Sequence, residues 1–218
     1  EFRRVLFRSL WDNGAIRDTG AVTWCNGVSG CNGVVSIDNS LVGGLLGDSL
    51  IGNLDPSIII TPLTNSNYVV SMPFWDNPNG PISDAGAVTW CNGATGTSGL
   101  ISQENSLVGT SLQDNVGGVT ALPNGNYLVL SRNWDNPTGP IANAGAVTWG
   151  NGTSGITGPI GISNSLIGGT EGDLIGMDNV TVLTNSNYIV NSPFWDNPVG
   201  PTKDVGAVTW CNGATGAT

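Results

Sequence analysis

The sequence of 218 residues has no histidine and a single lysine, Lys203. Without histidine, the chain has no imidazole to act as the general base of a Ser-His-Asp or Cys-His arrangement. Most carboxylates also recur in register along the chain, whereas an active site needs a unique constellation of groups. We therefore expect no enzyme within this stretch of chain, and we assign no catalytic residue.

Positive charge is scarce as well, because six lysines and arginines face 16 aspartates and glutamates, which gives a net charge of −10 at pH 7. A chain this acidic repels phosphate backbones and anionic lipid headgroups, so we expect no nucleic-acid partner. Long apolar runs are missing too. The richest patch, Ser57–Leu63, is short and interrupted by proline, whereas a membrane helix needs about 18 apolar residues. We therefore expect no membrane insertion.

The four cysteines do not form a disulfide framework. Cys25, Cys91 and Cys211 occupy one repeat position in the first, second and fourth copies, where the third copy has Gly150. Cysteines in different copies lie too far apart to pair if the copies are rigid. Cys31 lies close to Cys25 in sequence, so a local bridge between them stays open, although we favour free thiols. No Cys-x2-Cys pair is present, so the usual zinc spacing is missing and we expect no metal site.

What the sequence has instead is a repeat with a period of roughly sixty residues. Trp-Asp-Asn occurs four times, and each occurrence is followed by Gly-Ala-Val-Thr-Trp, so all eight tryptophans belong to the pattern. We divide the chain into three full copies and a partial fourth, at residues 11–74, 75–133, 134–194 and 195–218.

Residues 1–9 match none of these copies, yet they carry three of the six basic residues. This segment resembles the translation of a sequencing-adapter end of the kind that contaminates metagenomic assemblies. We expect it to be an artefactual tail outside the fold. Because the fourth copy is partial, we also expect the chain to be a fragment of a longer protein.

The second copy illustrates the local structure of all of them. Asn67–Met72 is β-branched and aromatic and predicts a strand, and Gly86–Trp90 predicts a second one that ends at the hairpin signal Asn92-Gly93. Shorter extended segments are expected at Leu100–Ser102, Asn105–Gly109 and Val119–Leu122. The unit therefore holds about four short strands, and no helical period is present.

Small sheets in series predict an all-β repeat array of four-stranded antiparallel sheets, β-propeller-like and open. A β-solenoid is the alternative, although the subperiod of about twenty residues that solenoid coils would leave is missing. So few units do not close a ring. The ends of the array should then expose apolar sheet faces, and we expect the protein to aggregate or oligomerise.

Two resemblances bear on the fold. One resemblance is to the FG-GAP blade of integrin-like propellers. It rests on the order Asp114-x-x-Gly117, Leu122, Asn126–Val129 and Gly145–Trp149, which recurs from Asp173/Gly176 and from Asp48/Gly52. The whole of 11–218 resembles Gly/Asn-rich repeats of unknown function from large bacterial haemagglutinin- or adhesin-like surface proteins. The second resemblance implies a bacterial extracellular or cell-surface location and an adhesive role.

The FG-GAP resemblance also raises the question of calcium, because such blades often carry a calcium loop. The corresponding turns here, at 63–67, 122–126 and 183–187, contain no carboxylate, and a calcium site needs several charged oxygens. We therefore expect no cofactor, with weak calcium binding at the rim as the open alternative.

The Trp-Asp-Asn loop is the strongest candidate for a ligand site. An exposed Trp ring can stack on a sugar face while the carboxylate and amide bind hydroxyl groups. The structural alternative, which we favour, is that Trp caps a sheet while Asp and Asn satisfy backbone groups in an Asx-turn. The candidate ligand-binding residues are Trp11, Asp12, Asn13, Trp75, Asp76, Asn77, Trp134, Asp135, Asn136, Trp195, Asp196 and Asn197.

The other repeated motifs have structural interpretations. Gly-Ala-Val-Thr-Trp predicts a buried strand. Asp48, Asp114 and Asp173 each precede a glycine and are expected to cap turns, with a cation site as the alternative. We interpret the chain as a structural and adhesive module whose partners are neighbouring repeats of its parent chain, with glycans or host-surface components as candidate external partners. The runner-up is a multivalent carbohydrate binder that uses the Trp-Asp-Asn loops.

Overall fold

The computed structural model describes residues 4–8, 10–48, 60–80, 82–178, 180–200 and 202–218. Parts of three sequence expectations lie outside these ranges: Glu1–Arg3 and Ser9 of the terminal segment, Gly52 of the third FG-GAP match, and Ser57–Ile59 of the apolar patch. Every regular element in the described ranges is a β-strand. Accordingly, these ranges contain no helix long and apolar enough to cross a membrane.

The described strands form four small sheets, and each sheet combines strands that precede a Trp-Asp-Asn string with strands that follow it. From here on, a copy is therefore counted from the strands that precede its Trp-Asp-Asn string. Their order across the sheets is β1-β2-β3-β7, β12-β8-β6-β5-β4, β13-β11-β10-β9 and β14-β15-β16. The strands are β1 (Arg4–Arg8), β2 (Ala21–Cys25), β3 (Ser40–Val42), β4 (Ile60–Pro62), β5 (Tyr68–Met72), β6 (Ala87–Cys91), β7 (Gly99–Leu100), β8 (Ser106–Val108), β9 (Gly118–Ala121), β10 (Tyr127–Ser131), β11 (Ala146–Gly150), β12 (Gly158–Pro159), β13 (Ser165–Ile167), β14 (Thr181–Val182), β15 (Tyr188–Ser192) and β16 (Ala207–Cys211).

The Gly-Ala-Val-Thr-Trp strand lies in the middle of each of the first three sheets. In the second sheet, β6 pairs antiparallel with β5 on one side and with β8 on the other. On the β8 side, the buried hydroxyls of Thr89 and Ser106 hydrogen-bond to each other at 2.7 Å, and Thr23–Ser40 and Thr148–Ser165 form the same pair in the neighbouring sheets. The threonine of the motif is therefore a cross-strand polar partner within the core, which fixes the register of the third strand.

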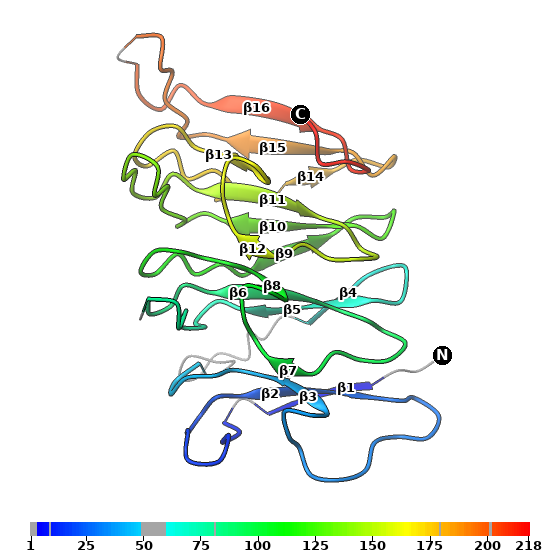
Figure 1. The fold of residues 1–218 in the computed structure, drawn as a ribbon. Coiled ribbons are helices and arrows are strands. Elements are labelled where there is room, and N and C mark those ends of the chain that lie inside the picture. Colours follow the sequence, from blue (N-terminus) through cyan, green and yellow to red (C-terminus); the bar gives the residue numbers. More distant parts are fainter. Residues whose placement is uncertain (1–3, 9, 49–59, 81, 179, 201) are drawn as a thin grey trace.

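Successive sheets are joined at their edges by short parallel strands. β7 belongs to the second copy but pairs in parallel with β3 of the first, and β12 of the third copy pairs in parallel with β8 of the second. Figure 1 shows β7 beside the β2–β3 sheet. The second and third copies therefore each add an edge strand to the sheet that precedes them.

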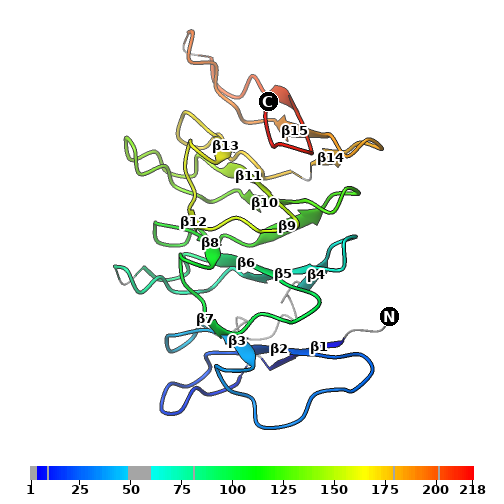
Figure 2. The same ribbon diagram turned by 45° about the vertical axis from the view of Figure 1, so that its right-hand side comes forward.

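The four sheets stack face to face in chain order, from β1–β3 at one end to β14–β16 at the other (Figures 1 and 2). The apolar core is divided among the spaces between the sheets. One cluster joins Val22 and Leu41 to Val70 and Met72, and the next joins Val69 and Val88 to Val129. A third cluster joins Leu128 and Val147 to Val190, among others. Burial of each sheet face thus depends on the neighbouring copy, as in other repeat arrays.

The N-terminal segment differs from the sequence expectation. Arg4–Arg8 forms β1 and pairs antiparallel with β2 over five residues, from Arg4 opposite Cys25 to Arg8 opposite Ala21. The pair β5–β6 has the same register, from Tyr68 opposite Cys91 to Met72 opposite Ala87. Residues 4–8 therefore lie within the fold, contrary to that expectation, because strand pairing uses backbone groups and does not require the sequence of the repeat. The origin of the segment as an adapter translation stays a prediction.

Candidate functional site

The leading tryptophans of the two internal Trp-Asp-Asn loops are buried. Trp75 is 1% exposed and Trp134 is 0% exposed, and each packs into the core cluster between its own sheet and the preceding one. Trp11 and Trp195, in the first and last copies, are half-buried. The exposed row of rings that a stacking site needs is therefore not present at Trp75 and Trp134, because neighbouring sheets cover them.

The aspartate of each Trp-Asp-Asn loop accepts a backbone hydrogen bond within its own copy. Its Oδ1 accepts the N–H of the residue two positions before the glycine of Gly-Ala-Val-Thr-Trp, at 2.7–2.9 Å. The four pairs are Asp12–Asp18, Asp76–Asp84, Asp135–Asn143 and Asp196–Asp204. The four donor residues have φ values of 50–54°, a left-handed conformation that Asp and Asn tolerate. The loop aspartate therefore acts as a turn cap, and the contact is the same at Asn143 because the donor is the backbone N–H.

The asparagine of the loop forms the expected Asx-turn. The Oδ1 of Asn77 accepts the N–H of Asn79 at 3.0 Å, and Asn136 and Asn197 accept from Thr138 and Val199 in the same way. In the second copy, the Nδ2 of Asn77 also donates to the Gly109 carbonyl oxygen at 3.2 Å. The polar groups of the loop are thus bonded to backbone, which is the structural interpretation favoured from the sequence.

A second set of aspartates ties each copy to the next. Asp48, Asp114 and Asp173 are buried. The Oδ2 of Asp114 accepts the N–H groups of Thr110 and Ser111, both at 2.8 Å, and its Oδ1 accepts the N–H of Asp135 in the following copy at 2.9 Å. Asp48 and Asp173 make the equivalent contacts. The predicted turn cap is confirmed, and the same carboxylate also holds the next Trp-Asp-Asn loop.

Burial raises the pKa of two of these carboxyl groups. Desolvation raises the pKa of Asp114 to about 6, partly offset by the backbone N–H groups that it accepts. The pKa of Asp48 is raised for the same reason. Each of these two carboxylates accepts three backbone N–H groups. Within the described ranges, no three side chains of the His, Cys, Asp or Glu type converge in a way that could hold a metal ion.

The second tryptophan of each copy forms a joint with the copy that follows. The indole Nε1 of Trp24, Trp90 and Trp149 donates to the carbonyl oxygen of Gly93, Gly152 and Gly213 at 3.1, 2.9 and 3.0 Å. Three residues further on, Gly96, Gly155 and Gly216 have φ of 75–78°. A Cβ on any of these glycines would lie 2.7 Å from the Cβ of the tryptophan in the preceding copy. We call this Trp–Gly contact the inter-repeat joint.

Asparagines complete the inter-repeat joint. The Nδ2 groups of Asn65 and Asn67 both donate to the Gly152 carbonyl oxygen, at 2.7 and 2.9 Å, beside the indole of Trp90. One copy later, Asn124 and Asn126 donate to Gly213 in the same way. These asparagines lie in the turns that the FG-GAP resemblance associates with calcium. Here their side chains bind the backbone of the next copy.

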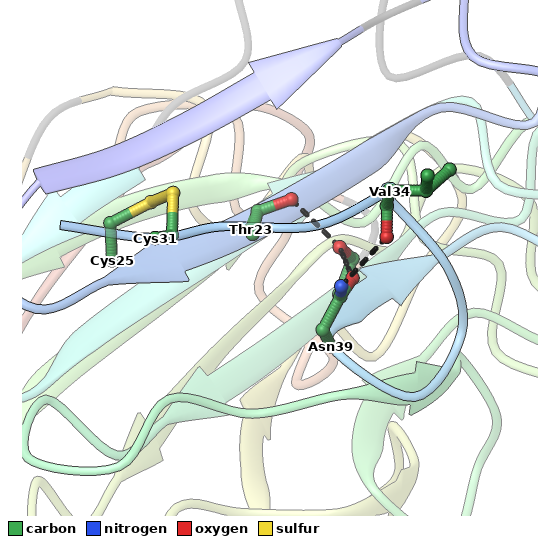
Figure 3. Close-up of a disulfide and its surroundings, with 6 residues drawn as sticks. Thr23, Cys25, Cys31, Val34 and Asn39 are labelled. Carbon is green, nitrogen blue, oxygen red and sulfur yellow. Dashed lines mark hydrogen bonds between the residues drawn. A yellow bond between two sulfur atoms is a disulfide. The ribbon is translucent and has the colours of Figure 1, made fainter.

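The first copy contains a disulfide, contrary to the preference for free thiols. Cys25 and Cys31 are bonded, with 4.9 Å between their Cα atoms, and Figure 3 shows them beside the loop that Asn39 holds through Val34. Cys31 occupies the position of Thr97 in the second copy, which lies close enough to Cys91 to hydrogen-bond. Cys91 and Cys211 are free and buried, and burial raises the pKa of Cys91 to about 12.

No curated protein matches the chain. A family model described as a repeat of unknown function (DUF5650) matches it four times, over residues 5–53, 62–118, 121–177 and 182–218. These matches begin one strand earlier than the copies defined from the Trp-Asp-Asn string, with the same period. The repeated aromatic and polar residues described above lie within the matches, which together span most of the chain. The chain therefore belongs to this family of repeats of unknown function.

Proposed function

We propose that the chain is a non-catalytic structural and adhesive module of a larger bacterial extracellular or cell-surface protein, in which rigid repeats space or present binding surfaces. One observation carries the proposal. The residues that recur in every copy hold copies together: tryptophan and asparagine through the inter-repeat joint, and aspartate through the Trp-Asp-Asn loop of the next copy. A module whose repeated residues bind each copy to the next is suited to act as a spacer of fixed length.

The Cys25–Cys31 bridge supports the proposed location. Disulfides form and persist mainly outside the reducing cytosol. The scarcity of lysine and the net charge of −10 also suit a soluble surface protein that avoids nucleic acids.

For the finer architecture, we propose an open, propeller-like stack in which each sheet acts as a blade against its neighbours. Face-to-face packing of small antiparallel sheets supports this arrangement. The parallel pairs β3–β7 and β8–β12 support the alternative, a β-solenoid, because they join successive sheets at one edge. Electron microscopy of longer arrays of the repeat distinguishes the two, since blades curve toward a ring whereas solenoid coils extend as a straight rod.

Small-angle X-ray scattering on the chain tests rigidity directly. A rigid stack gives a pair-distance distribution that matches the four-sheet array and stays unchanged in moderate salt. Sheets that move independently on flexible linkers would give a broader distribution with a longer maximum dimension, and that result would contradict the spacer role. Adhesion is tested separately, by binding of immobilised protein to host cells and matrix components.

Multivalent carbohydrate binding through the Trp-Asp-Asn loops is the second candidate. Because Trp75 and Trp134 are covered, stacking would fall to Trp11 and Trp195, which are half-buried. A glycan array probed with the chain and with the Trp195→Ala variant tests it. Sugar binding that the variant loses would favour this function over a purely structural one.

A further inference from the structure

A groove of about 500 Å³ is lined by parts of β9 and β10, which lie in the middle of the stack (Figure 2). The second copy contributes Phe74 and Asn115 to its lining, and the third contributes Arg132, Asn133 and Met177. None of the lining residues belongs to the inter-repeat joint or to a Trp-Asp-Asn string. The groove is therefore formed by two successive copies without the residues that hold copies together through those motifs.

Two departures from the repeat meet in this groove. The dipeptide before the leading tryptophan is Pro-Phe in the second and fourth copies but Arg132-Asn133 in the third. Met177 lies in the segment 176–183, which is two residues longer than the equivalent segment 117–122. Residues that recur in every copy have structural roles here, whereas a site for chemistry or binding needs a unique constellation of groups. The groove is therefore the place in the described chain where we look for a ligand.

The charge that the groove offers to a ligand is positive. The side chain of Arg132 is exposed, and it forms no hydrogen bond or ion pair with any described residue. Asp114 also lines the groove, but it is 1% exposed and its carboxylate accepts three backbone N–H groups. A planar guanidinium group binds a carboxylate through two parallel hydrogen bonds. Arg132 is therefore suited to bind a carboxylate of a ligand.

The rest of the lining combines apolar surface with amide groups. Phe74 is 37% exposed and Met177 is 41% exposed, so both leave apolar surface uncovered. The Nδ2 of Asn133 donates to the Oδ1 of Asn115 at 3.4 Å, which brings two amides together. Amide groups donate and accept hydrogen bonds, so they can bind hydroxyl groups. A sugar ring has an apolar face and several hydroxyl groups, and this lining matches both.

We propose that the groove binds a sugar that carries a carboxylate, such as a uronic acid. In this contact, Arg132 binds the carboxylate and Phe74 lies against the apolar face of the ring. Asn115 and Asn133 bind hydroxyl groups. The inference rests on the adhesive part of the proposed function and names its ligand class. It differs from sugar binding by the Trp-Asp-Asn loops, because none of the residues of those strings takes part.

Two pairs of variants test the contacts. Arg132→Gln removes the charge, and its matched control is Arg17→Gln, at another exposed arginine outside the groove. Phe74→Leu removes the ring, and its control is Phe194→Leu, because Phe194 occupies the same repeat position and is 38% exposed. All four side chains are at the surface, so the variants should fold like the unmodified chain and give the same small-angle scattering curve.

An NMR titration of the isotope-labelled chain with sodium glucuronate gives the test. Glucuronate should shift the amide signals of Gly118–Thr120 and Leu130–Asn133 until they saturate. Glucose and acetate should bind at least about tenfold more weakly, because each lacks one part of the ligand. Arg132→Gln should weaken glucuronate binding at least about tenfold, and Phe74→Leu about two- to tenfold. The two control variants should bind glucuronate like the unmodified chain.

Three results would contradict the proposal: no saturable shift, binding of glucose or acetate as tight as that of glucuronate, or tighter binding of an acidic peptide such as tetraglutamate. The last result would assign the groove to peptides. Small-angle scattering judges the spacer role separately. A rigid array that does not bind glucuronate would overturn this inference alone, whereas a flexible array that binds it would overturn the spacer role alone.

Discussion

The indole N–H of Trp90 donates to the carbonyl oxygen of Gly152 at 2.9 Å, although 62 residues separate them in sequence. That oxygen also accepts hydrogen bonds from Asn65 and Asn67. Three donors from one copy therefore converge on a single backbone atom of the next. Because the same arrangement recurs at Gly213, it defines how copies of the repeat are spaced.

Gly155→Ala tests how closely the copies approach. The added Cβ would lie 2.7 Å from the Cβ of Trp90, in a backbone conformation with φ +76°. We expect it to lower the free energy of unfolding by about 2–4 kcal/mol, from overpacking and backbone strain together. Gly172→Ala has a similar φ, +83°, with nothing within 4 Å, and should cost only the strain, about 1–2 kcal/mol. If urea denaturation gives equal losses of the free energy of unfolding for the two variants, the close approach of Gly155 to Trp90 does not contribute to stability.

Asn126→Ala tests the amide contact between copies, with Asn187→Ala as its matched control. Both side chains accept the N–H of a glycine in their own copy, Gly152 for Asn126 and Gly213 for Asn187. Only Asn126 also donates to the following copy. The Asn126 variant should therefore be less stable than the Asn187 variant by about 1 kcal/mol. Thermal or urea unfolding curves that coincide would assign no stability to the contact between copies.

Acidification should stabilise the fold through the buried aspartates. The folded pKa of Asp114 is raised from 3.8 to about 6, so the folded state binds a proton more tightly than the unfolded state. This contribution is fully present below about pH 4 and is lost as the pH rises through 6. We expect the free energy of unfolding to rise by about 1–2 kcal/mol between pH 7 and pH 5. Asp114→Ala should make this rise in the free energy of unfolding smaller. If the free energy of unfolding of the unmodified chain falls between pH 7 and pH 5, the raised pKa of Asp114 is contradicted.

The free thiols should be unreactive in the folded chain. Burial raises the pKa of Cys91 to about 12 and also raises that of Cys211, so neither thiol ionises appreciably at pH 8. An aromatic disulfide reagent should label neither until urea is added, when both react. The Cys211→Ser variant isolates Cys91, and rapid labelling of that variant under native conditions would show that the second sheet opens readily.

The sequence was sufficient to predict the strands of one copy. Tyr68–Met72, Ala87–Cys91 and Ser106–Val108 lie where alternation, β-branched residues and turn signals placed them. The Asx-turn at Asn77 also followed from local chemistry. These features depend on contacts between residues near one another in the chain, for which residue type alone carries the information.

Contacts between copies could not be predicted in the same way. Gly99–Leu100 is only two residues long, so nothing in its sequence says that it pairs in parallel with the preceding sheet. The sequence likewise showed that Trp90 and Gly152 recur but not that they meet. The prediction of free thiols at Cys25 and Cys31 was wrong. It relied on the repeat position of Cys25, whereas the short loop between the two residues brings Cys31 back to Cys25.

The central claim is that the second tryptophan of each copy stabilises the array by binding the copy that follows. The same substitution in two positions tests it most directly: Trp90→Phe removes an indole with a following copy, and Trp210→Phe removes one without. Urea denaturation should be measured at a concentration where the chain is monomeric. We predict a loss of about 1–3 kcal/mol for Trp90→Phe and less than about 0.5 kcal/mol for Trp210→Phe. Equal losses at the two positions would contradict the claim.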